Sequence, residues 1–166
     1  MRLHRLLIAC LALGSLSLPG QAVASGPAKI DTAQLITAFT AICLDHIADS
    51  PAQTAAGTAA PWLLVQDGAP DNGLTFYRSD TLAMGIRSGD GQSCGVTANV
   101  PLAQDLATVS TLVGTTLGLG EGQADPDNNS HYWMIQAEAD SQRFAIAIKV
   151  SGVSGENVAT LLLQKL

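Results

Sequence analysis

Hydrophobic positions along the chain follow helical spacing in two segments and strand spacing in several others. Apolar residues recur at intervals of three and four between Leu35 and Ile47, which predicts a helix capped by Asp31 or Thr32 and ending near Asp49. The same spacing from Leu102 to Val113 predicts a second helix with Pro101 in its first turn. Strands are predicted at residues 74–77, 82–87, 94–100, 132–138 and 143–150.

The segments between these elements complete the predicted order. Residues 62–65 suit a short strand or a turn of helix, and residues 157–166 suit a short helix or a strand. Small residues bounded by prolines predict a surface linker at residues 50–61. Asp90-Gly91 and residues 139–142 predict two hairpin turns, residues 124–130 predict a polar loop, and no internal repeat is evident.

We therefore expect an α+β fold, with an antiparallel sheet of about five strands and two or three helices packed on one face. The expected order is α-β-β-β-α-β-β-α/β. This order resembles that of type III secretion chaperones, a small dimeric peptide-binding fold, and the resemblance covers the element order alone.

The first 24 residues have the composition of a secretory signal. Arg2, His4 and Arg5 precede an apolar run over residues 6–18, and Ala22-Val23-Ala24 resembles a cleavage site. We expect a cleaved signal peptide at residues 1–24, a single domain at 25–166, and a periplasmic or secreted location. The apolar run is too short to span a membrane. An alternative is an envelope lipoprotein acylated at Cys10, which follows Leu7-Ile8-Ala9.

Composition and charge narrow the possible partners. The chain has 166 residues, 47% of them hydrophobic, with 8 Lys and Arg against 14 Asp and Glu. Cleavage after Ala24 would shift the formal charge from −6 to −8, because it removes two arginines and no acid. Such a charge repels phosphate backbones, so nucleic acid is an unfavourable partner.

Two cysteines, Cys43 and Cys94, remain after the expected cleavage. An even number of cysteines in an exported chain predicts a disulfide. Neither cysteine belongs to a C-x-x-C motif, and no basic residue adjoins either one to lower its pKa. We therefore expect a structural bridge.

A serine hydrolase is the sharpest catalytic alternative. Gly91-Gln92-Ser93-Cys94-Gly95 matches G-x-S-x-G, and Asp125 or Asp127 and then His131 follow in the order of nucleophile, acid and base. The motif requires a helix after the serine, however, whereas residues 96–100 have strand character. A hairpin turn followed by a bridged strand is the favoured interpretation.

Three other polar clusters have ordinary structural interpretations. Residues 125–129 begin like a calcium loop but lack the glycine at position 6 and the glutamate at position 12. The glycines at 114, 118, 120 and 122 follow a predicted helix, which favours a helix end over a nucleotide site. Asp45, His46 and Asp49 suit a solvated helix terminus. We identify no metal site and no cofactor.

Alternation at residues 132–137 separates two sheet faces. Trp133 is expected in the core, whereas Tyr132 and Met134 share the opposite face, which is either solvated or covered by a partner. We expect an exported, non-catalytic binding or interaction module for an unknown protein or small molecule. A small serine hydrolase using Ser93 and His131 remains the alternative.

Overall fold

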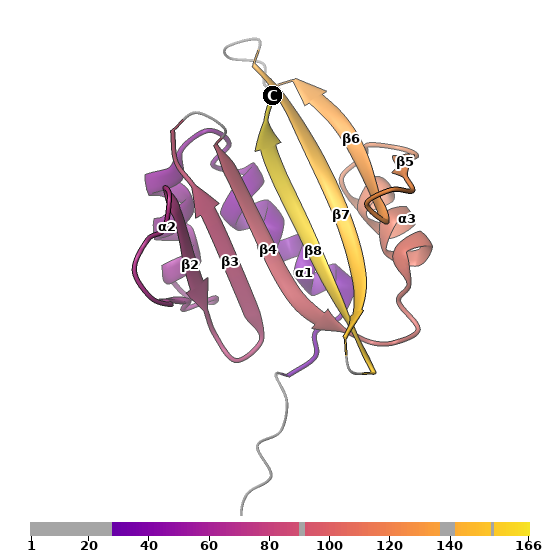
Figure 1. Ribbon diagram of the computed structural model, residues 1–166, viewed down its shortest axis with the longest axis horizontal. Coiled ribbons are helices and arrows are strands. Elements are labelled where there is room, and N and C mark those ends of the chain that lie inside the picture. The colour runs from indigo at the N-terminus through magenta and orange to yellow at the C-terminus, as the bar shows by residue number, and fades with distance from the viewer. Residues whose placement is uncertain (1–27, 90–91, 137–141, 154) are drawn as a thin grey trace, which may run out of the picture.

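The computed structural model describes residues 28–89, 92–136, 142–153 and 155–166. The strands form one eight-stranded sheet in the order β1-β2-β3-β4-β8-β7-β6-β5, and every neighbouring pair is antiparallel (Figure 1). The helical elements are α1 (Thr32–Phe39), the π-helical turn η1 (Thr40–Leu44), α2 (Ser50–Thr58) and α3 (Leu106–Thr116). The strands are β1 (Val65–Gln66), β2 (Leu74–Arg78), β3 (Leu82–Arg87), β4 (Ser93–Val100), β5 (Gln123–Asp125), β6 (Ser130–Gln136), β7 (Arg143–Val153) and β8 (Glu156–Lys165).

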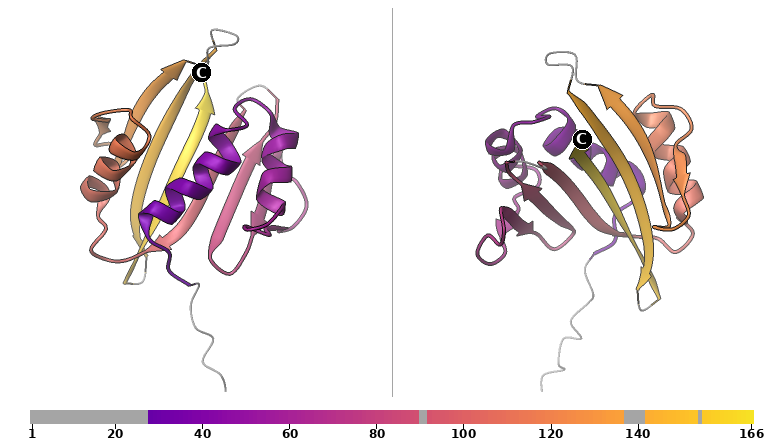
Figure 2. Two further views of the ribbon diagram at one scale, coloured as in Figure 1. Left: turned by 180° about the vertical axis from the view of Figure 1, so that it is seen from behind. Right: turned by 45° about the horizontal axis from the view of Figure 1, so that its top comes forward.

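The helices all lie on one face of the sheet, as the view from behind shows (Figure 2). Side chains alternate along each strand, so every second residue points toward the helices. Those positions hold the core, including Val96 on β4, Ile148 on β7 and Leu161 on β8, each fully buried. No helix within the described ranges covers the other face, which we call the open face.

The α+β class and the antiparallel sheet are confirmed, but the expected five strands and their order are wrong. The two outermost strands, β1 and β5, have only two and three residues, too few to give a periodic signal. The last element is a ten-residue strand, because Ala159, Leu161 and Leu163 alternate into the core. The observed element order also differs from the expected order on which the resemblance to type III secretion chaperones rested.

Residues 50–58, predicted as part of a linker, form α2. Asp49 caps this helix by accepting a hydrogen bond from the backbone N–H of Ala52 at 3.0 Å, and Pro51 occupies the first turn. Alanines then provide high helix propensity. The second predicted helix starts later than expected, at Leu106 after its cap Asp105, and Pro101 lies outside it.

The chain consists of two similar halves that meet in the centre of the sheet. Each half has a helix followed by four consecutive antiparallel strands, β1–β4 in one and β5–β8 in the other. The final strands of the two halves, β4 and β8, pair with each other. The sheet therefore has approximate twofold symmetry about the β4–β8 contact.

The first helix of each half repeats the same hydrogen bonds. Asp31 accepts from the N–H of Gln34 at 2.7 Å, and Asp105 accepts from that of Thr108 at 2.8 Å. One turn farther on, each helix has a threonine hydroxyl that donates to an alanine carbonyl at 2.9 Å. These bonds run from Thr37 to Ala33 and from Thr111 to Ala107.

The strands carry the repeat in their sequence as well. Residues 70–77, PDNGLTFY, match residues 126–133, PDNNSHYW, and residues 82–87, LAMGIR, match residues 144–149, FAIAIK. Each pair of segments occupies corresponding turns and strands of the two halves. The expectation that the chain has no internal repeat is therefore wrong: the copies are identical at only five of these fourteen positions, so identity alone does not reveal them.

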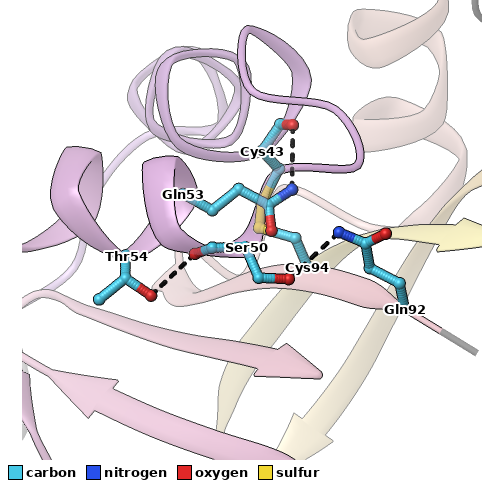
Figure 3. Close-up of a disulfide and its surroundings, with 6 residues drawn as sticks. All are labelled: Cys43, Ser50, Gln53, Thr54, Gln92 and Cys94. Carbon is cyan, nitrogen blue, oxygen red and sulfur yellow. Dashed lines mark hydrogen bonds between the residues drawn. A yellow bond between two sulfur atoms is a disulfide. The ribbon is translucent and has the colours of Figure 1, made fainter. Parts of the chain in front are cut away.

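The predicted disulfide joins Cys43 of η1 to Cys94 of β4, and both cysteines are buried (Figure 3). Beside the bridge, the amide of Gln53 donates to the carbonyl of Cys43 at 3.5 Å. Gln92, just before β4, donates to the hydroxyl of Ser50 at 3.1 Å. The covalent bond and these contacts fasten the helices of the first half to the sheet.

Candidate functional site

The residues of the predicted serine hydrolase do not meet. Ser93 begins β4 on the open face, whereas His131 on β6 faces α3. Strands β8 and β7 lie between them, a lateral separation of roughly 14 Å at the usual strand spacing. A nucleophile and base on opposite faces of a sheet cannot exchange a proton, so the structure offers no Ser93–His131 pair.

The G-x-S-x-G segment also lacks the local shape that the motif requires. Residues 90–91 lie outside the described part of the chain, but Ser93–Val100 is one continuous strand. Cys94 within the motif is held in the disulfide. Asp127, the third member of the proposed triad, lies in the exposed turn between β5 and β6.

The acidic clusters form ordinary structural contacts. Asp125 accepts hydrogen bonds from the side-chain and backbone N–H groups of Asn128, and the side-chain bond is the main cause that lowers the pKa of Asp125. Asp45 follows η1, and Asp49 caps α2. Within the described ranges, no three His, Cys, Asp or Glu side chains are grouped to hold a metal ion. Cys10 and the expected cleavage site lie outside those ranges.

An uncharged row of side chains crosses the open face. The strand registers align one residue each from β2, β3, β4, β8, β7 and β6. In that order the residues, which we call the open-face row, are Phe76, Gly85, Gly95, Leu162, Ala147 and Tyr132. The row therefore has an aromatic side chain at each end, one from each half, and small side chains over most of its middle. The predicted assignment of Tyr132 to the face opposite the buried Trp133 is confirmed.

Two glycines make the row shallowly concave. A Cβ on Gly85 would lie 3.4 Å from the ring of Phe76, and one on Gly95 would lie 3.4 Å from the side chain of Leu162. The side chains of Phe76 and Leu162 therefore lie over the backbone of Gly85 and Gly95, respectively. A hollow of about 260 Å³ lies here, and Phe76 stays 51% exposed.

Positive charge is concentrated on the open face although the protein as a whole is acidic. Four of its basic residues point to this face: Arg78, Arg87, Arg143 and Lys149. Arg78 pairs with Asp67, while the other three make no ion pair with a described residue. Two acids belong to the strands, Asp125 and Glu156. Both occupy open-face positions in the strand register, and Glu156 pairs with Lys29. The remaining described acids lie at helix ends and in loops.

A second candidate site lies on the helical side of the sheet. Ser110 of α3 and His131 of β6 are joined by a hydrogen bond of 2.6 Å between Oγ and Nδ1. Both line a hollow of about 480 Å³ bounded by α3 and the loop that contains Gly120 and Glu121. His131 was predicted as the base of a Ser93 nucleophile, but its hydrogen-bond partner in the structure is Ser110. The internal repeat would have directed attention to Ser110, because it replaces the apolar Ile36 of the first half.

Comparison of the chain with protein-family models, curated proteins and solved structures finds no match. Among the described residues, no helix has the length and apolar character needed to cross a membrane. Two features therefore remain as candidate sites, the open-face row and the hollow beside Ser110 and His131.

Proposed function

We propose that the protein is an exported binding module and that its open face receives an acidic, partly apolar polypeptide. The observation that carries this proposal is the open-face row, six uncharged residues flanked by Arg87, Arg143 and Lys149. An uncovered apolar surface rimmed by polar groups is typical of an interaction site. The buried disulfide is consistent with an oxidising compartment, which supports export.

The shape of the open face favours a polypeptide over a small molecule. Small-molecule sites enclose most of their ligand in a deep pocket. The hollow over Gly85 and Gly95 is small and open, whereas the row continues across six strands. A partner with apolar side chains on one face could lie along the row and place carboxylates beside the flanking bases.

The test uses two synthetic peptides of equal length, one alternating leucine with glutamate and the other alternating leucine with lysine. We expect the acidic peptide to shift backbone amide NMR signals of β3, β4, β7 and β8, and the basic peptide to leave them unchanged. Arg87→Glu combined with Lys149→Glu should remove the response. Because both side chains lie on the uncovered face, this double variant should still fold.

Asp45→Lys combined with Asp49→Asn is a control that changes the charge on the helical side, by +3 against the −4 of the open-face double variant. It should leave the response to the acidic peptide intact. Equal responses to the two peptides, or shifts confined to the helices, would contradict the proposal.

A further inference from the structure

The Ser110–His131 pair has the arrangement of a nucleophile and its base. The Oγ···Nδ1 distance of 2.6 Å is within the range for proton transfer between such groups. Ser110 is 5% exposed and His131 is half-buried, and the wall of the hollow contains both. This hydrogen bond joins the middle of α3 to the second residue of β6.

The hydroxyl oxygen of Ser110 lies within hydrogen-bond distance of Nδ1 of the imidazole. Serine and threonine in helices often donate to the carbonyl one turn earlier, and the neighbouring Thr111 does so with Ala107. Ser110 instead has His131 as its partner among the described residues. With Nδ1 as acceptor, the neutral imidazole carries its own proton on Nε2.

The fold does not require this polar pair. Ser110 corresponds to Ile36 in the first half, which is 2% exposed, and His131 corresponds to Thr75. The same helix therefore packs on the same kind of sheet with an apolar residue at this position. Among the described residues, this serine–histidine pair is present on the wall of the hollow in the second half and not at the matching positions of the first.

Two glycines, Gly114 and Gly122, allow the loop that lines the hollow to lie close to α3 and β6. A Cβ on Gly114 would lie 2.1 Å from the carbonyl oxygen of Gly120, and one on Gly122 would lie 2.8 Å from the ring of Trp133. Both positions thus allow the loop to approach α3 and β6 more closely than any other residue would permit. Gly120 adopts a φ of 70°, and Glu121 next to it lines the hollow.

From this geometry we propose that Ser110 is an acyl-accepting nucleophile, that His131 is its base, and that small carboxylic esters are the substrates. A hollow of about 480 Å³ has the size of a small-molecule site. This activity is independent of the open-face function, because the two sites lie on opposite sides of the sheet.

The reaction needs no co-reactant other than water. Oγ of Ser110 forms a bond to the ester carbonyl carbon while its proton passes to Nδ1 of His131. The bond from that carbon to the alcohol oxygen then breaks, and the alcohol leaves with the proton from Nδ1. Water attacks the acyl-serine, gives one proton to Nδ1, and the carboxylic acid leaves as that proton returns to Oγ.

The test is labelling of the folded wild-type protein with a biotinylated fluorophosphonate, followed by peptide mapping, together with hydrolysis of p-nitrophenyl acetate. We expect one adduct, at Ser110, and no adduct in Ser110→Ala. His131→Gln should slow labelling and hydrolysis about 100-fold, because a positioned general base contributes at least that much. Ser93→Ala is the matched control and should behave as wild type.

Folding of each variant is checked by circular dichroism. If Ser110→Ala does not fold, the mapped adduct in the wild type and the effect of His131→Gln still decide the result. A folded wild-type protein without an adduct, an adduct at another residue, or unchanged labelling in His131→Gln would overturn the proposal.

Discussion

The two halves of this protein share one scaffold but secure and use it differently. In the first half, a disulfide and α2 hold the helices against the sheet. In the second half, the corresponding helix is held by the Ser110–His131 hydrogen bond and by a glycine-rich loop beneath it. Because the scaffold is common, the fold does not dictate the residue at a position where the halves differ, and the Ser110–His131 pair occupies two such positions.

The features that the halves share define the open face. Phe76 and Tyr132 occupy matching positions at the two ends of the open-face row, and Gly85 matches Ala147. The central pair of strands contributes a threonine from each half, Thr97 and Thr160, whose hydroxyls are 3.0 Å apart. A nearly symmetric surface results, whereas the Ser110–His131 hydrogen bond joins positions that Ile36 and Thr75 occupy in the first half.

The largest expected effect is on the covalent link of the first half. Cys43→Ser combined with Cys94→Ser removes a bond that closes a 51-residue separation. In the chain-entropy model this should lower the free energy of unfolding by about 4 kcal/mol. Guanidinium unfolding of the wild type and the double variant measures the difference. A reduced wild-type protein should unfold with the variant, and equal midpoints for oxidised and reduced protein would show that the bridge is dispensable.

The next largest change in unfolding free energy is expected at Ile36, whose matching position in the second half is Ser110. Ile36→Ala leaves a cavity in a tightly packed core and should cost about 3 kcal/mol of unfolding free energy. Ser110→Ala removes one hydrogen bond whose other partner, His131, is half-buried, and should cost about 1 kcal/mol. Urea unfolding of both variants provides the test. A larger loss for Ser110→Ala would mean that the polar pair is a structural requirement of the second half.

Sequence reasoning predicted those elements whose residues alternate or repeat clearly. The strands around Met84, Val96 and Ile146 follow from period-two alternation, and the disulfide follows from cysteine count. Of the two short edge strands, β5 was not predicted, and β1 overlaps the possible strand at residues 62–65 by one residue, because two or three residues carry no period. Residues 50–58 were misread because alanine-rich segments suit both linkers and helices, and the cap at Asp49 decides between them.

The candidate sites depended on contacts between residues that are distant in sequence. His131 was selected, but its serine partner belongs to a helix 21 residues earlier rather than to the motif at Ser93. The open-face row requires the register of six strands, which alternation within single strands does not supply. Only its Tyr132 end was anticipated, from the separation of faces at residues 132–137.

A smaller change in the unfolding free energy is expected when alanine replaces one glycine in each half. Gly114→Ala gains helix propensity but forces a Cβ to within 2.1 Å of the carbonyl oxygen of Gly120, so we expect a net loss of about 2 kcal/mol. Gly85→Ala introduces the residue that the second half already has at Ala147, and it should change the unfolding free energy by less than about 0.5 kcal/mol. Thermal unfolding of both variants distinguishes them. If Gly114→Ala is neutral, the loop does not need its close approach to α3.

The smallest effect concerns the cap of α3 and its dependence on pH. The backbone N–H of Thr108, and next its hydroxyl, donate to Asp105 and lower its pKa in the folded protein. A lowered pKa adds stability above the carboxyl's unfolded value, about 3.9, and that contribution is lost as the pH falls through the folded value. Asp105→Asn keeps the capping oxygen but cannot ionise.

We therefore expect a small, constant stability difference between wild type and Asp105→Asn at neutral pH, which shrinks in acid. Urea midpoints measured from about pH 7 to about pH 2.5 give this difference directly. Asp31→Asn makes the same change at the matching cap of the first half, so it tests whether a plain Asp-to-Asn exchange at a cap disturbs the helix. A difference for Asp105→Asn that stays constant into strong acid would show that the cap of α3 acts through hydrogen-bond geometry without the carboxylate charge.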